Sequence, residues 1–222
     1  MSAPAPVMPA LRRLRAHFGP IPALRPERPI DCLVRTILSQ NTSDVNSGRA
    51  YRGLRRRFRS WDAVRRAPLA EIANAIRSGG LANIKAPRIR GALETIKQRD
   101  GNYSLRALRG MDAGTAIASL TEIKGIGAKT AACVLLFALG MPVMPVDTHV
   151  FRVAGRLGWI RPHTRIESAR EDLERIIPAG RILDFHLYLI DLGRAMCRPG
   201  RPRCRPCPLS RLCPAADVNK RI

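Results

Sequence analysis

The chain has 222 residues, of which 45% are hydrophobic, and a formal net charge of +22 from 39 lysines and arginines against 17 aspartates and glutamates. Its length suffices to bury a core, and without a signal sequence in residues 1–10 or an apolar run of membrane-spanning length we expect a soluble, intracellular, cytoplasmic protein. So large a positive charge, spread along the whole chain, predicts a nucleic-acid partner, with a solvated basic surface as the alternative and membrane binding disfavoured.

Apolar residues recur with a helical period along most of the chain, as at Ile30, Leu33 and Ile37. Strand-like alternation is absent, and glycine and proline breaks such as Gly79-Gly80 separate the periodic segments. We therefore predict an all-α protein of about ten short helices.

The segment Ala116 to Leu139 reads as a helix, a tight turn at Gly125-Ile126-Gly127 and a second helix that starts near Ala128. We expect both glycines to take backbone angles closed to other residues, and to bring bare N–H groups against a DNA phosphate at the second helix's positive end. Such a contact ignores base sequence. A lone Gly-x-Gly between helices is more often an ordinary turn.

Lys129 follows this turn, at the start of a helix that is apolar nearly all round. The helix N-terminus and any desolvation would both disfavour its ammonium form, which is what a nucleophilic amine needs near neutral pH. The alternative is a solvated lysine in a first helical turn.

Asp147, in the segment Pro145-Val146-Asp147-Thr148-His149, precedes the next helix and is a natural N-cap. A carboxylate held there can also stabilise positive charge on a sugar ring and assist proton transfer. The two roles are compatible if different carboxylate oxygens serve them.

Four cysteines near the C-terminus have the spacing C-x6-C-x2-C-x5-C, at Cys197, Cys204, Cys207 and Cys213. Four thiolates from one loop suit an iron-sulfur cluster, with zinc and disulfides as alternatives. Cys32 and Cys133 lie in apolar, helix-like segments and are expected to be buried free thiols.

The hairpin segment 123–131, then the segment 146–149, then the cysteine loop, together resemble the endonuclease III family of DNA glycosylases. The resemblance runs from about Pro29 to Cys213 and implies a [4Fe-4S] cluster on the four cysteines. It also implies two helical lobes with the active site in a cleft between them. Residues 21–140 would form a six-helix barrel with the helix-hairpin-helix, and residues 1–20 and 141–222 a helical iron-sulfur cluster domain.

By this resemblance Lys129 is the Schiff-base lysine and Asp147 the catalytic aspartate of a bifunctional glycosylase and abasic-site lyase. The damaged nucleotide is flipped from the duplex, Lys129 attacks C1′, the base departs, and β-elimination nicks the strand. The implied substrates are oxidised pyrimidines in double-stranded DNA, or abasic sites, and the enzyme is expected to act as a monomer. The alternatives are a mismatch glycosylase for uracil, thymine or adenine, and a non-catalytic DNA-binding relative.

The resemblance also assigns DNA contacts. Asn41 stands where the family usually has a glutamine that fills the vacated stack, and Gln40 is an alternative. Leu81 resembles the apolar wedge, although it is equally a candidate core residue. Lys124, where the family commonly has proline, lies near the phosphate expected at Gly125 and Gly127.

Arginines surround the cluster cysteines and are expected to contact the DNA backbone, Arg205 among them, with a solvated charge run as the alternative. The set is Arg198, Arg201, Arg203, Arg205 and Arg211. His149 and His186 are not assigned to catalysis, because a lone helix histidine is more often structural. Trp61 and Trp159 are expected to be packing residues.

Overall fold

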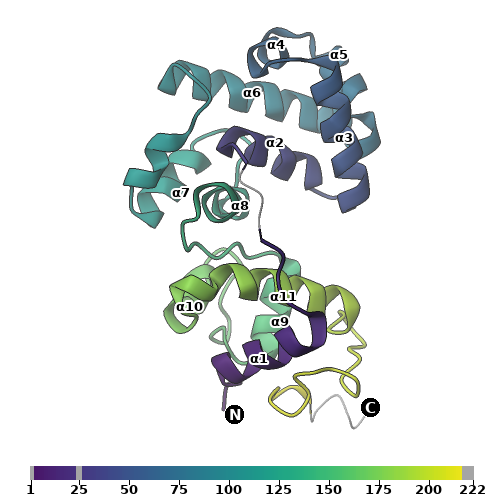
Figure 1. Cartoon of the computed structure of the whole chain (residues 1–222), viewed down its shortest axis with the longest axis vertical. Helices are drawn as coiled ribbons and strands as arrows, with labels where there is room; N and C mark the ends of the chain where they lie inside the picture. The colour runs from purple at the N-terminus through teal and green to yellow at the C-terminus, as the bar shows by residue number, and fades with distance from the viewer. Residues whose placement is uncertain (1–2, 24–26, 217–222) are drawn as a thin grey trace. The chain divides into compact units, whose positions relative to one another are not determined.

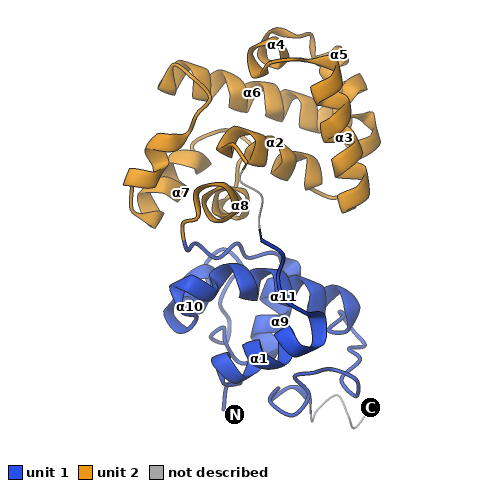
Figure 2. Ribbon diagram, viewed as in Figure 1, with its two compact units in different colours: residues 1–25, 142–222 blue, residues 26–141 orange. Residues whose placement is uncertain are grey.

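The computed structural model describes residues 3–23 and 27–216. Within these residues it contains only helices and connecting segments (Figure 1), so the prediction of an all-α protein is confirmed. No helix in the described ranges is both long and apolar enough to cross a membrane. The chain divides into two compact units, which are coloured separately in Figure 2 and described one at a time below.

Unit 2 comprises residues 26–141 and contains the predicted hairpin. Its helices are α2 (Pro29–Ser39), α3 (Asp44–Arg57), α4 (Trp61–Arg66), α5 (Leu69–Ala75), α6 (Ala82–Asp100), α7 (Ala113–Thr121) and α8 (Ala128–Leu139), with short 3-10 turns η1 (Arg77–Gly79) and η2 (Arg106–Gly110).

The core of unit 2 forms around α2, which contacts α3, α6 and α8. Residues at α2's apolar positions, such as Leu33, Val34 and Ile37, are fully buried. Cys32 and Cys133 lie buried in this core, and neither forms a disulfide with a described residue, as predicted. Burial raises the pKa of Cys32, since a thiolate would be poorly solvated there.

Unit 1 comprises residues 1–25 and 142–222. Its helices are α1 (Val7–Phe18), α9 (Thr148–Arg156), α10 (Ala169–Ile176) and α11 (Ile182–Ala195), with a short turn η3 (Ala179–Arg181). The helix α11 packs against α9 and α1. Trp159 donates a hydrogen bond to the carbonyl of Ala5 at 2.7 Å and meets Phe185 edge-on, which ties the N-terminal segment to this core.

Candidate functional site

The turn between α7 and α8 is built as the hairpin prediction requires, with one correction. Gly125 has φ +89°, a conformation that disfavours any side chain, and the side chain of Arg88 covers the place where a Cβ would stand. Gly127 instead has φ −93° and ψ 171°, which any residue adopts, so the expectation of a special conformation at both glycines is wrong for Gly127. Among the described residues, the N–H groups of Gly127, Ala128 and Lys129 meet no acceptor. They form a ready anion site.

Lys129 is exposed in the first turn of α8, and no described carboxylate pairs with it. The desolvation considered from the sequence is therefore not found at Lys129. Its neighbour Thr130 is buried and accepts a hydrogen bond from Gln40 Nε2 at 3.3 Å. The start of α8 is thereby tied to the loop after α2.

Asp147 is the N-cap of α9. Its Oδ1 accepts both capping hydrogen bonds, from the N–H groups of His149 at 2.9 Å and Val150 at 2.8 Å. Oδ2 accepts none from the described residues. The capping prediction is therefore confirmed, and one carboxylate oxygen remains available for other chemistry.

The two residues expected to enter DNA are both exposed, and both have a left-handed backbone conformation. Asn41 has φ +53° and Leu81 has φ +50°, and Leu81 is 48% exposed, so the alternative of a core leucine is wrong. Asparagine tolerates this conformation, whereas a leucine adopts it only when the surrounding structure holds it there, so Leu81 is the strained residue of the two. Gln40 behaves differently, because Thr130 and the guanidinium of Arg88, at 3.0 Å, hold both ends of its amide.

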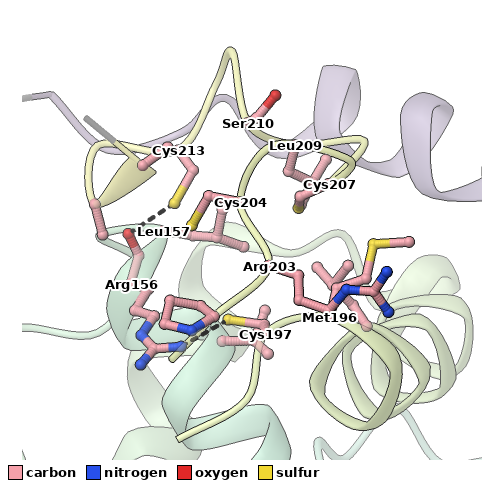
Figure 3. A pocket seen from close by; sticks show the side chains of 15 residues that line it. Arg156, Leu157, Met196, Cys197, Arg203, Cys204, Cys207, Leu209, Ser210 and Cys213 are labelled. Carbon is pink, nitrogen blue, oxygen red and sulfur yellow. Dashed lines mark hydrogen bonds between the residues drawn. The ribbon is translucent and has the colours of Figure 1, made fainter. Parts of the chain in front are cut away.

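The four cysteines of the C-terminal loop line one cavity in unit 1, shown in Figure 3. Arg156 of α9 donates a hydrogen bond to Cys197 Sγ at 3.2 Å, and Cys213 Sγ donates one to the carbonyl of Arg156 at 3.4 Å. Burial, reinforced by the neighbouring thiols, raises the pKa of Cys207 to about 11. Metal binding would displace the proton of such a thiol.

The two metal alternatives, zinc and an iron-sulfur cluster, need different arrangements of the four sulfurs. In a tetrahedral zinc site with Zn–S bonds of about 2.3 Å, the sulfurs would lie about 3.8 Å apart. No three His, Cys, Asp or Glu residues of the described chain are placed to hold a single ion in this way. A cubic cluster needs its thiolates spread around a cavity instead, because each binds a different iron. Four cysteines around one cavity are the donor set that such a cluster requires.

Known proteins give independent comparisons. Residues 34–179 match the family described as HhH-GPD superfamily base excision DNA repair protein. The chain is 30% identical over 185 residues to endonuclease III of Thermotoga maritima, spanning 83% of this chain and 82% of that one. The chain belongs to the HhH-GPD superfamily of base excision DNA repair proteins. The predicted endonuclease III relationship is confirmed.

Two further comparisons extend this result. A solved structure of a trapped covalent intermediate of endonuclease III with DNA superposes on this chain with a TM-score of 0.80, at 27% identity and 95% coverage of each chain. A candidate DNA glycosylase of Arabidopsis thaliana is 39% identical over 168 residues, which are 76% of this chain. The chain spans only 57% of that plant relative's length.

The arginines of the cysteine loop are all exposed, and none forms an ion pair with a described residue. They are Arg198, Arg201, Arg203, Arg205 and Arg211. Lys124 is likewise exposed on the hairpin, beside the buried Ile123. These cations are free to meet phosphates.

The unassigned histidines and tryptophans have structural partners. Buried His186 hydrogen-bonds through Nδ1 to the carbonyl of Pro145 at 3.0 Å, two residues before Asp147. His149 Nδ1 lies 3.1 Å from the guanidinium of Arg152. Trp61 and Trp159 are both buried, as expected of packing residues.

Sequence reasoning missed Lys85. It is 1% exposed, and its ammonium donates to the carbonyls of Leu38 at 2.7 Å and Gly79 at 2.8 Å. The sequence contained one indication that Lys85 is buried. Lys85 shares a helical face with Ile89 and Ile96, which are both buried.

Proposed function

We propose that this protein is a bifunctional DNA glycosylase, which releases oxidised pyrimidines from duplex DNA and then cleaves the strand as an abasic-site lyase. The observation that carries the proposal is Lys129, which stands exposed and without an ion pair beside the unclaimed N–H groups of the hairpin. A phosphate bound to those groups would hold the DNA backbone next to the amine. A lysine in this place has no structural task in unit 2.

The chemistry balances with the groups present. The neutral amine of Lys129 attacks C1′, the glycosidic bond breaks with its electron pair going to the base, and the base takes up a proton. The amine proton passes to Asp147, whose Oδ2 is not used in capping. Asp147 returns this proton to O4′ as the sugar ring opens to an iminium, a water molecule takes up the C2′ proton as the 3′ phosphate leaves with its electron pair, and a second water hydrolyses the iminium to regenerate the enzyme.

Asn41 and Leu81 would occupy the space that the flipped nucleotide leaves. Both side chains project from loops and are exposed, as a residue that inserts into DNA must be. Asn41 is shorter than glutamine, so we expect the preference for the opposite base to depend on it. Lys124, Gly125, Gly127 and Arg205 would contact the phosphate backbone.

A panel of labelled duplexes tests the substrate class, with thymine glycol, dihydrouracil, uracil and thymine mismatches, adenine mismatches, or an abasic site. We expect base release and a β-elimination nick at the oxidised pyrimidines, and a nick at the abasic site. Release from mismatches alone would make the protein a mismatch glycosylase. Binding without release or nicking on every duplex would make it a non-catalytic relative.

We further propose that Cys197, Cys204, Cys207 and Cys213 hold a [4Fe-4S] cluster. When bound, the cluster would supply a fixed framework for the arginine-bearing loop rather than a step of the reaction. Iron, sulfide and zinc analysis of the purified protein tests this. We expect about four irons and four sulfides per chain, lost in Cys204→Ser and kept in Cys32→Ala, whereas stoichiometric zinc would contradict the proposal.

A further inference from the structure

A basic groove lies in unit 2, away from the hairpin. It has a volume of about 1020 Å³ and is lined by the start of α2, the junction of α3 with α4, the segment 102–109 and the end of α8. All its lining residues belong to unit 2. The loop with Asn41 follows the other end of α2, and Lys129 starts the other end of α8. Since a helix rises about 1.5 Å per residue, the groove lies roughly 15 Å or more from both.

The carboxylates at this groove are already neutralised. Asp62 accepts hydrogen bonds from the hydroxyl of Tyr103 at 3.1 Å and from Arg65 at 3.1 Å, and it pairs with Arg66 at 2.8 Å. Glu27 pairs with Arg35 at 3.7 Å. Neither carboxylate is left to balance further positive charge.

The unpaired charges at the groove are cationic. Arg59, Arg106 and Arg109 are exposed, and their guanidinium groups meet no acceptor among the described residues. Arg28, also at the groove, is already paired with Asp31 at 2.6 Å. Three guanidinium groups therefore face the groove with their donors unused.

Arg55 adds an observation that a solvated surface does not explain. Its guanidinium lies over the ring of Trp61, 4.7 Å from the centroid, and its Nη2 reaches the carbonyl of Arg59 at 3.4 Å. Its Nη1 is buried and has no hydrogen-bond partner in the described part of the chain. A buried donor left unpaired costs about 1–3 kcal/mol, a cost that a water or a ligand oxygen would remove.

We propose that this groove binds the phosphate groups of a second nucleic-acid segment, while the hairpin surface holds the first. Guanidinium groups suit phosphate oxygens because they offer several donors in a plane. Their spread over the α3–α4 junction and the segment 102–109 suits a phosphodiester backbone rather than one isolated ion. An enzyme with such a groove would bridge two DNA segments, a property separate from base release.

A bridging measurement tests the groove without using catalysis. An immobilised undamaged duplex is saturated with the holoprotein, and capture of a labelled second duplex is followed against salt. We compare Arg59→Gln/Arg106→Gln/Arg109→Gln with Arg49→Gln/Arg52→Gln/Arg56→Gln, a control that removes the same charge from exposed positions of α3 that do not line the groove.

We expect the groove variant to lower capture of the second duplex at least tenfold, and to reduce its salt slope by about 2 to 3 because each phosphate contact contributes about 0.9. Binding of the first duplex and its nicking should change less than twofold, and the control should capture normally. Equal loss in both variants would overturn the proposal, since net charge alone would then explain capture. Pyrophosphate binding in the groove without any captured duplex would also overturn it.

Discussion

Gln40 donates a hydrogen bond to the hydroxyl of Thr130, the residue that follows Lys129. Its carbonyl accepts another from Arg88, whose side chain packs over Gly125 of the hairpin. One amide thus joins the loop of Asn41 to both sides of the hairpin turn. To enter DNA, Gln40 would have to break both hydrogen bonds of its amide. This favours Asn41 over Gln40 as the residue that we propose to insert.

Gln40→Ala should therefore loosen this loop rather than remove a DNA contact. We expect excision from duplex DNA to fall about tenfold while stability falls by only about 1 kcal/mol, the value of a typical hydrogen bond. Single-turnover rates and urea unfolding measure the two effects. An unchanged excision rate would show that the Gln40 connection plays no part in activity.

Leu81→Gly should separate strain from function. Glycine adopts φ +50° without the steric penalty of leucine, so stability should stay level or rise by up to about 1 kcal/mol. Base release should nevertheless fall about tenfold, because the side chain is gone. His163→Gly is the matched control, since His163 is also exposed and left-handed, with φ +62°, and excision should be unaffected. Full activity in Leu81→Gly would exclude Leu81 as a wedge.

Lys85→Met should disturb both inserting loops at once. It removes the donor that joins Leu38, three residues before Asn41, to Gly79, two residues before Leu81. We expect a loss of about 2 kcal/mol from unpaired carbonyls, and slower excision from duplex DNA with unchanged cleavage of a single-stranded abasic site. Ile96→Ala, a destabilising change on the same helix, should leave the ratio of these two rates unchanged. An altered ratio in both variants would contradict a positioning role.

The burial of Lys85 predicts that the stability of the fold depends on pH. Burial lowers the pKa of Lys85 from its ordinary value of 10.5. Between the folded and unfolded pKa values the unfolded chain binds more protons, so this group's contribution to stability rises with pH in that window. Wild-type stability relative to Lys85→Met should increase as the pH is raised toward 10.5, measured by urea unfolding at several pH values. A decrease would show that its hydrogen bonds outweigh burial.

Asp147→Asn should separate capping from chemistry. Asparagine caps as well as aspartate, so stability should change by less than about 0.5 kcal/mol, whereas excision should fall about 100-fold or more with the loss of the proton acceptor. Asp147→Ala should lose both activity and about 1 kcal/mol of stability. Equal rates for Asp147→Asn and the wild type would remove Asp147 from the mechanism.

The helical fold, the hairpin and the cap at Asp147 could be predicted because each depends on local chemistry: apolar period, glycine in a turn, and an acid before a helix. The partners of Gln40 and Lys85 could not, because Thr130 and Leu38 are distant in sequence and reach them only through the packing of α2, α6 and α8. Gly127 shows that local chemistry can also mislead, because a glycine within a motif need not have an unusual backbone conformation.

The most direct test of Lys129 as the nucleophile is borohydride reduction during reaction with a thymine glycol duplex, followed by peptide mass spectrometry of the adduct. We predict one covalent complex attached at Lys129, absent in Lys129→Gln and retained in Lys124→Gln, which changes the other exposed lysine of the hairpin. An adduct that persists in Lys129→Gln, or base release by the wild type with no adduct, would contradict the assignment of Lys129 as the nucleophile.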